Sequence, residues 1–289
     1  MARVVGLHRL TLSVPEIEKA GGFYRDGWGM RVVSRSGRRW HLQSRAMDHP
    51  DLALVLTEGA SGLSTVALQV KDRAALSALL IATSQSGSRL LQAPGDSVHH
   101  PGEYCATVED PDGNKIELVV PASAGTGPGD VPEAAGPLRI GHAVLWTPQI
   151  EPMESFYALL GLRVSDRTTI GMSFLRCNMD HHSVALARSS GRTGLQHVAF
   201  DVGTREAVER EKARLAADGV QCFWGPGRHG PGNNVFSYYR DPAGTIIEFY
   251  GEMQKVPVNE DPAEPVYWGP EHRGDITGVA GPAPVEFRS

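Results

Sequence analysis

Short apolar segments alternate with amphipathic helical segments along most of the chain. IGHAVLW and LQHVAFDV each predict a short strand with a histidine near its start. A helical pattern follows each strand, over residues 151–161 and 204–219. The apolar residues of the first helix share one face and are Met153, Phe156, Tyr157 and Leu160. The second helix ends at Gly219, a usual helix terminator. Further short strands follow each helix, so each unit is predicted to contain a strand, a helix and three strands.

The first half of the chain repeats this plan. SYYRDPAGTIIEFYG near the end of the second half is echoed by VEDPDGNKIELVV in the first, where Glu117 matches Glu248. GLHRLTLSV likewise answers GHAVLWTPQ, and FYRDGWGMRVV answers FYALLGLRVS, at nearly the same offset. Small drifts in the offset indicate loop insertions in a true internal repeat. We therefore predict four units, over about residues 5–57, 62–121, 138–189 and 194–251.

Two segments fall outside these units. Residues 122–137 are rich in proline, glycine and small residues without periodicity, which predicts a linker. Residues 252–289 are also rich in proline and glycine but carry aromatic residues, which predicts an irregular C-terminal arm packed on the surface. The expected domains are therefore 1–121 and 138–251, joined by the linker.

Composition narrows the class of protein. With 289 residues, of which 41% are hydrophobic, the chain can bury a sizeable core. A net charge of −5 without basic runs gives no footprint for nucleic acid or an anionic membrane, so a small-molecule ligand is expected. Cys105, Cys177 and Cys222 are scattered and odd in number, which favours a reducing compartment. Without a signal peptide or membrane-span pattern, we expect a cytoplasmic location.

Three residues of the second half form a candidate metal site. His142 and His197 occupy equivalent positions on the first strands of units three and four, and Glu248 lies in an apolar strand. A buried carboxylate needs a compensating cation or metal. Two imidazoles and one carboxylate are the ligand set of non-haem iron(II) sites with open positions. Taken singly, each histidine could be a core residue and the glutamate could reach solvent, but their matching positions favour a metal site.

The motifs of the second half resemble a known family. GHAVL, CNMDHHSVAL, GLQHVAFDV, GPGRHG, SYYRDPAG and IIEFYG, in that order, are similar to those of type I extradiol catechol dioxygenases of the vicinal oxygen chelate superfamily. The resemblance implies an α+β fold of two tandem domains. Each domain would pair two βαβββ units into an incomplete mixed-sheet barrel around a cavity.

The same resemblance assigns roles to individual residues. It places the metal ligands at the same two histidines and Glu248, the acid/base histidine at His182, the substrate-contacting histidine at His229 and the catalytic tyrosine at Tyr238. His181 and Tyr239 are competing assignments for the acid/base and tyrosine roles. Further implications are Fe(II), with Mn(II) possible, O2 as co-substrate, a small aromatic diol as substrate and a homo-oligomeric state. The neighbouring Asn233 and Asn234 could contact substrate or simply form a turn.

The first half departs from this pattern. His8 and Glu117 persist, but Thr65 stands where the second half has His197, and Thr107 stands where it has Tyr238. We expect a domain without a complete metal site, in which His8 is packed as a remnant. Two other functions stay open for the whole chain: a metal-dependent isomerase or thiol transferase of the same superfamily, and a non-catalytic small-molecule-binding protein.

Overall fold

The computed structural model describes residues 3–44, 53–122, 136–257, 266–269 and 274–287. The first half forms one eight-stranded sheet in the order β2-β3-β4-β1-β5-β8-β7-β6. Its strands are β1 (Val4–Val14), β2 (Met30–Ser36), β3 (Arg39–Ser44), β4 (Ala53–Glu58), β5 (Gly62–Val70), β6 (Leu90–Asp96), β7 (Tyr104–Glu109) and β8 (Lys115–Val120).

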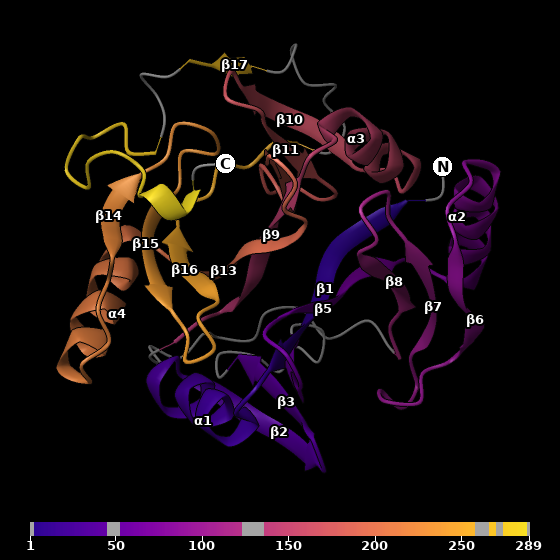
Figure 1. Cartoon of the computed structure of the whole chain (residues 1–289), viewed down its shortest axis with the longest axis horizontal. Helices are drawn as coiled ribbons and strands as arrows, with labels where there is room; N and C mark the ends of the chain where they lie inside the picture. The colour runs from indigo at the N-terminus through magenta and orange to yellow at the C-terminus, as the bar shows by residue number, and fades with distance from the viewer. Residues whose placement is uncertain (1–2, 45–52, 123–135, 258–265, 270–273, 288–289) are drawn as a thin grey trace.

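The second half forms a nine-stranded sheet in the order β14-β15-β16-β13-β9-β12-β11-β10-β17. Its strands are β9 (Arg139–Thr147), β10 (Arg163–Thr168), β11 (Met172–Arg176), β12 (Val184–Arg188), β13 (Gly194–Gly203), β14 (Trp224–Arg228), β15 (Val235–Arg240), β16 (Ile246–Gly251) and β17 (Val266–Trp268). Figure 1 shows the two sheets as separate curved layers.

One helix follows the first strand of every unit. These helices are α1 (Ile17–Gly22) with the π-helical turn η1 (Phe23–Gly27), α2 (Arg73–Gln85), α3 (Ile150–Leu159) and α4 (Arg205–Ala217). The predicted helix over 204–219 begins after Thr204, whose hydroxyl accepts a hydrogen bond from the Ala207 backbone N–H. It ends before Gly219, which has a left-handed φ of +77°.

The topology confirms the predicted fold class. In both halves the first strands of the two units lie side by side and antiparallel, as β1–β5 and β9–β13. Each of these strands pairs in parallel with the last strand of its own unit. The sheets are mixed and open, as the expected incomplete barrels require. The boundaries of the linker remain a prediction, since residues 123–135 lie outside the described part of the chain.

The repeated Asp-Pro motif builds the same turn in both halves. Asp241 accepts hydrogen bonds on Oδ1 from the backbone N–H groups of Ala243 and Thr245, at 2.9 and 2.8 Å. Asp110 makes the equivalent bonds to two N–H groups of its own turn. Gly244 has a φ of +84°, which glycine adopts without strain. The motif therefore explains how the last two strands of each second unit are connected.

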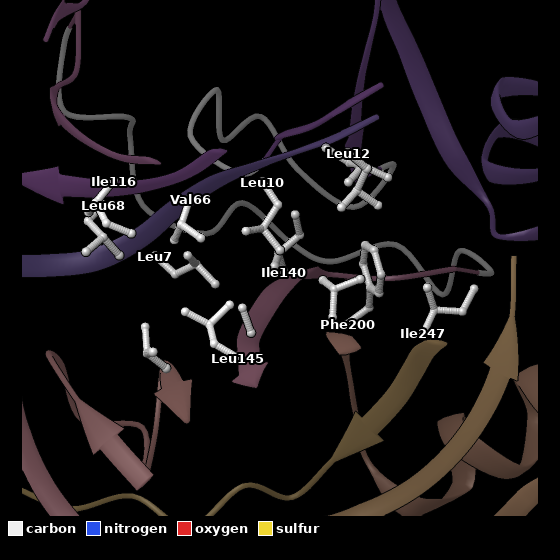
Figure 2. Close-up of a cluster of buried hydrophobic side chains, with 14 of the residues drawn as sticks. Leu7, Leu10, Leu12, Val66, Leu68, Ile116, Ile140, Leu145, Phe200 and Ile247 are labelled. Carbon is white, nitrogen blue, oxygen red and sulfur yellow. The ribbon is translucent and has the colours of Figure 1, made fainter. Parts of the chain in front are cut away.

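The two halves share one hydrophobic core. Figure 2 shows side chains of β1 and β5 meeting Ile140, Leu145, Phe200 and Ile247 of the second half. Trp28 stacks on the Phe249 ring at a centroid distance of 3.6 Å. This packing supports one face of β9, β13 and β16, and so positions the strands that carry the candidate metal ligands.

The C-terminal arm, expected to be irregular over 252–289, contains two short regular segments among its described residues. Its β17 pairs in parallel with β10, and the 3-10 turn η3 (Val285–Phe287) lies over the second sheet (Figure 1). The three cysteines are free thiols. Among the described residues, no helix combines the length and apolar character needed to cross a lipid bilayer.

Candidate metal centre and surrounding cavity

Three adjacent strands bring His142, His197 and Glu248 together. His142 lies on β9, His197 on β13 and Glu248 on β16. Ala199 of β13 is the register partner of both His142 and Glu248, so these two side chains flank it on the same face of the sheet. His197, two residues before Ala199, shares that face. The repeated units therefore bring three residues that are far apart in the sequence into one cluster.

The three side chains have the geometry of a metal site. Their ligand atoms all lie within 4.8 Å of one another. The Nε2 atoms of His142 and His197 lie 3.3 and 3.1 Å from Glu248 Oε2. All three residues are buried, and Glu248 is 0% exposed. Within the described part of the chain, His197 Nε2 and Glu248 Oε2 make no hydrogen bond. Two buried lone-pair atoms aimed at one point fit a divalent cation.

The electrostatics agree with a carboxylate that is ionised in spite of burial. Burial opposes ionisation of Glu248, but the neighbouring His142 and His197 outweigh it and hold the pKa of the carboxyl well below its usual range. Burial also lowers the pKa of His197. A neutral imidazole beside an ionised carboxylate is the protonation state in which both groups bind metals.

The other predicted site residues lie around the same cluster. The His182 ring is 4.3 Å from the His142 ring, centroid to centroid. His229 Nε2 and the Tyr238 hydroxyl are hydrogen-bonded at 3.0 Å, and His229 Nε2 lies 4.0 Å from Glu248 Oε1. Burial raises the pKa of Tyr238 well above its usual value, with a further contribution from Glu248. The phenol is therefore protonated at neutral pH and available as a donor.

A cavity of about 390 Å³ opens in front of this cluster. His142, His197, His182, His229 and Tyr238 all line it. Its remaining walls are largely apolar and come from the sheet, the turns between its strands and the C-terminal arm: Val144, Ile170, Met172, Phe174, Trp224, Pro231, Pro282, Ala283 and Phe287. The volume and the aromatic walls suit one small planar ligand.

The competing residues are placed differently. His181 is buried outside the cavity lining and contacts His182 and Asp166. Tyr239 is 0% exposed on the opposite face of β15, where its ring packs 5.6 Å from Trp28. This alternation follows from the pleat of a strand. Among the described residues that line the cavity are His182 but not His181, and Tyr238 but not Tyr239.

Several contributors were not assigned to the site from the sequence. Asn234, proposed only as a substrate contact or turn residue, is buried and donates a hydrogen bond to Glu248 Oε1 at 3.3 Å. Asn233 is exposed in the turn, with a φ of +51°. Gln196 Oε1 lies 3.0 Å from His197 Nδ1 and orients that ring. The Gly274 carbonyl accepts a hydrogen bond from His229 Nδ1 at 2.7 Å.

The first half has an arginine where the second half has its candidate metal ligands. A β-bulge at His8 places Arg9 opposite Ala67, which also faces Glu117. Arg9 donates to Glu117 Oε2 at 2.7 Å and to both oxygens of Glu103. His8 Nε2 lies 2.9 Å from Glu103 Oε1. The buried guanidinium thus supplies the positive charge that a metal would supply.

This arrangement predicts an acid-sensitive ion cluster. Burial opposes ionisation of Glu103, but His8 and Arg9 outweigh it and lower the pKa of the carboxyl to about 2. A carboxyl whose pKa is lower in the folded chain stabilises folding above its unfolded pKa, and this contribution is lost as pH falls through the folded value. Stability should therefore decline from about pH 5 downward.

We expect Arg9→Met to lower the free energy of unfolding by about 3–5 kcal/mol near neutral pH, because two partly buried carboxylates lose their main partner, a buried guanidinium. Urea unfolding followed between pH 7 and pH 3 measures this. The control Arg38→Met breaks the exposed pair with Glu58 and should cost at most about 1 kcal/mol. Equal stability of the Arg9 variant and the wild type at neutral pH would show that the cluster contributes nothing.

Comparisons with known proteins agree with this architecture. The sequence profile of the Glyoxalase/Bleomycin resistance protein/Dioxygenase superfamily matches residues 6–118 and 139–249. Metapyrocatechase 2 of Cupriavidus necator is 33% identical over 172 residues, or 52% of this chain and 53% of that protein. Biphenyl-2,3-diol 1,2-dioxygenase of Metapseudomonas furukawaii is 26% identical over 229 residues, covering 73% and 71%. The chain thus spans about half the length of the first curated relatives that it matches.

A solved structure is similar over nearly the whole chain. The Mn(II)-bound glyoxalase from Novosphingobium aromaticivorans superposes with a TM-score of 0.91 at 27% identity, covering 99% of this chain and 94% of that one. Because the superfamily profile matches both halves and well over half of all residues, the protein belongs to the Glyoxalase/Bleomycin resistance protein/Dioxygenase superfamily.

Proposed function

We propose that the protein is an extradiol dioxygenase that inserts both atoms of O2 into a catechol-type diol and gives a ring-opened semialdehyde. The observation that carries this proposal is the meeting of His182, His229 and Tyr238 with the metal-binding cluster around one cavity. The names of the relatives metapyrocatechase 2 and biphenyl-2,3-diol 1,2-dioxygenase support the same chemistry.

His142, His197 and Glu248 would hold the metal, which we propose is Fe(II), with Mn(II) as the alternative. When bound there, this metal would supply the redox chemistry that allows a catechol and dioxygen to react. Asn234 and Gln196 would keep two of the ligands aimed at it. The expected homo-oligomeric state and cytoplasmic location remain predictions.

His229 and Tyr238 would bind the oxygens of the diol. They are hydrogen-bonded to each other at 3.0 Å beside Glu248, so an incoming hydroxyl can exchange hydrogen bonds with both. The protonated phenol of Tyr238 can donate a hydrogen bond to an ionised diol oxygen. This bond favours loss of the proton from that diol hydroxyl. Trp224 and Phe287 lie near the Tyr238 ring, at centroid distances of 5.1 and 4.9 Å, and exclude water from this side.

His182 would move the proton of the diol. Burial and the neighbouring histidines lower its pKa well below the usual value, so the imidazole is a free base at neutral pH. In that state it accepts a proton from a substrate hydroxyl and later returns the same proton to a reacting oxygen. A histidine suits both steps because one ring nitrogen serves as acceptor and then as donor.

The cavity walls favour a diol without a charged substituent. The described residues that line the cavity include no lysine, arginine, aspartate or glutamate. Burial of a carboxylate against such walls would carry a desolvation cost without a paired cation. Arg273 and Arg288, which could pair with a carboxylate, lie outside the described residues.

The proposal is tested by mixing anaerobically purified, Fe(II)-loaded protein with catechol, an alkyl catechol and 2,3-dihydroxybiphenyl in air. A yellow ring-opened product is expected from at least one diol, and chelation of the metal should abolish it. Separate assays with the Mn(II)-loaded protein compare the two candidate metals. Absence of any ring-opened product with either metal would contradict the proposal.

A second candidate is a metal-dependent isomerase, because the similar solved structure is named a Mn(II)-bound glyoxalase. Such a reaction needs the metal ligands but not the additional set of His182, His229 and Tyr238. Conversion of a thiol hemithioacetal of a 2-oxoaldehyde by the Mn(II)-loaded protein, with no cleavage of diols, would favour it. A non-catalytic binding protein would bind diols and yield neither product.

A further inference from the structure

A chain of three hydrogen-bonded side chains leads away from the cavity through buried protein. His182 Nδ1 lies 3.1 Å from His181 Nδ1, and His181 Nε2 lies 3.0 Å from Asp166 Oδ2. The exposed fractions are 4% for His182, 2% for His181 and 7% for Asp166. Only the first member, His182, lines the cavity. The other two therefore act on a ligand only through His182.

The carboxylate end sets the direction of the hydrogen bonds. Asp166 also accepts hydrogen bonds from the Trp268 indole N–H, at 2.8 Å on Oδ2, and from the Val266 backbone N–H, at 3.1 Å on Oδ1. A carboxylate that accepts two such donors is an acceptor for the third as well, so His181 Nε2 carries a hydrogen. In a neutral His181, Nδ1 is then the acceptor.

The tautomer of His181 determines the tautomer of His182. Because His181 Nδ1 accepts, His182 Nδ1 must carry the hydrogen between them. His182 Nε2 is left with a lone pair, and within the described part of the chain it makes no hydrogen bond. Its neighbours on the cavity side are the His142 ring and Phe174, whose centroid is 5.0 Å away.

The C-terminal arm contacts Asp166 and His181, the two members of the hydrogen-bonded series that lie away from the cavity. Strand β17 pairs in parallel with β10 so that Val266 is the register partner of Asp166. The His181 backbone N–H donates to the Gln254 carbonyl at 2.9 Å. The arm therefore contacts both residues behind His182.

We propose that Asp166 and His181 are positioning residues that hold His182 as the Nδ1–H tautomer, with the Nε2 lone pair presented to the cavity. An isolated neutral imidazole in water favours the opposite tautomer, so the protein must impose this one. The consequence of this tautomer for turnover rests on the proposed dioxygenase function, because the lone pair on His182 Nε2 would accept the proton of a diol. The tautomer itself does not depend on that function.

The tautomer can be measured without turnover. The full-length chain, labelled with ¹⁵N in its histidine rings and saturated with diamagnetic Zn(II), is studied by long-range ¹H–¹⁵N NMR. His181→Phe and His182→Phe spectra assign the two rings. We expect hydrogen on Nδ1 of His182 and on Nε2 of His181, and a shift of His182 toward the Nε2–H form in the His181→Phe variant. Hydrogen on Nε2 of His182 in the wild-type chain would overturn the proposal.

A double-mutant cycle separates positioning from mere packing. In the Fe(II)-loaded enzyme, His181→Phe should lower kcat on the order of tenfold with little change in KM, as loss of an orienting partner does. In the His182→Phe background, the same substitution should change kcat no further, because nothing remains to be positioned. Equal losses in both backgrounds would mean that His181 only supports packing, and would overturn the proposal.

A matched control removes a contact of the C-terminal arm that does not involve Asp166, His181 or His182. Lys255 forms an ion pair with Asp180, next to His181. Lys255→Met should leave kcat and the His182 tautomer unchanged. A loss equal to that of His181→Phe would show that any loosening of the arm suffices, and would contradict a specific role for Asp166 and His181. If the wild type opened no diol at all, the proposed function would fail, while the NMR result would still decide the tautomer.

Discussion

The Glu248→Ala variant should lose nearly all bound divalent metal and, with it, ring cleavage. Glu248 supplies the only negative charge among the three proposed ligands, and its removal would leave two neutral imidazoles around a dication. Loss of an outer-shell partner alone typically costs 10–100-fold in metal affinity, so loss of this ligand should cost more than about a hundredfold. Metal analysis after gel filtration, together with oxygen uptake, measures both effects.

Folding of this variant should be affected little in the absence of metal. The substitution removes the desolvation cost of a buried charge together with its favourable interactions with His142 and His197, so the two effects offset each other in large part, although Asn234 loses its acceptor. The internal repeat offers a matched control, since Glu117 is the equivalent carboxylate of the first half and is paired with Arg9. Glu117→Ala should leave metal content unchanged. Tight metal binding with full turnover in the Glu248 variant would show that this carboxylate is structural.

The His182→Phe variant should keep its metal and still bind a catechol, yet lose most of its ring-cleavage rate. His182 lies beside the three proposed ligands without being one of them, and its proposed role begins only after the diol is bound. Losing a positioned acid/base costs on the order of a hundredfold to ten-thousandfold. Anaerobic difference spectra with catechol measure binding, and steady-state oxygen uptake measures turnover.

The adjacent His181→Phe variant is the natural comparison and should cost far less. Both rings are buried and of the same size, so a general packing defect would affect the two variants alike. Equal activity in both, or a collapse confined to the His181 variant, would overturn the assignment of His182. Loss of iron from the His182 variant would instead identify it as a ligand.

Much of the fold could be predicted because the chain repeats itself. The Asp-Pro-x-Gly turn recurs with the same hydrogen bonds at Asp110 and Asp241, which marks the two halves, and the strand and helix pattern within each half predicted two units in each. Equivalent positions in paired units share one face of a sheet, which is why His142, His197 and Glu248 could be grouped from the sequence.

Other features depend on contacts that a repeat does not encode. Arg9 faces Glu117 only because a bulge at His8 shifts the register of β1. Asp166 reaches the site through His181, and its partner β17 lies about a hundred residues further along the chain. Single-sequence patterns carry little information on such long-range pairs, and the proline and glycine content of the arm predicted irregular structure, so β17 was not predicted.

The central claim is that both atoms of dioxygen enter the diol at this site. It is tested most directly by running one turnover of the Fe(II)-loaded protein with a catechol under ¹⁸O₂ and measuring the mass of the ring-opened product. We expect a product that carries two labelled oxygen atoms before exchange with water, and no such product from Glu248→Ala. A product with one labelled atom or none, or an unchanged yield in that variant, would contradict it.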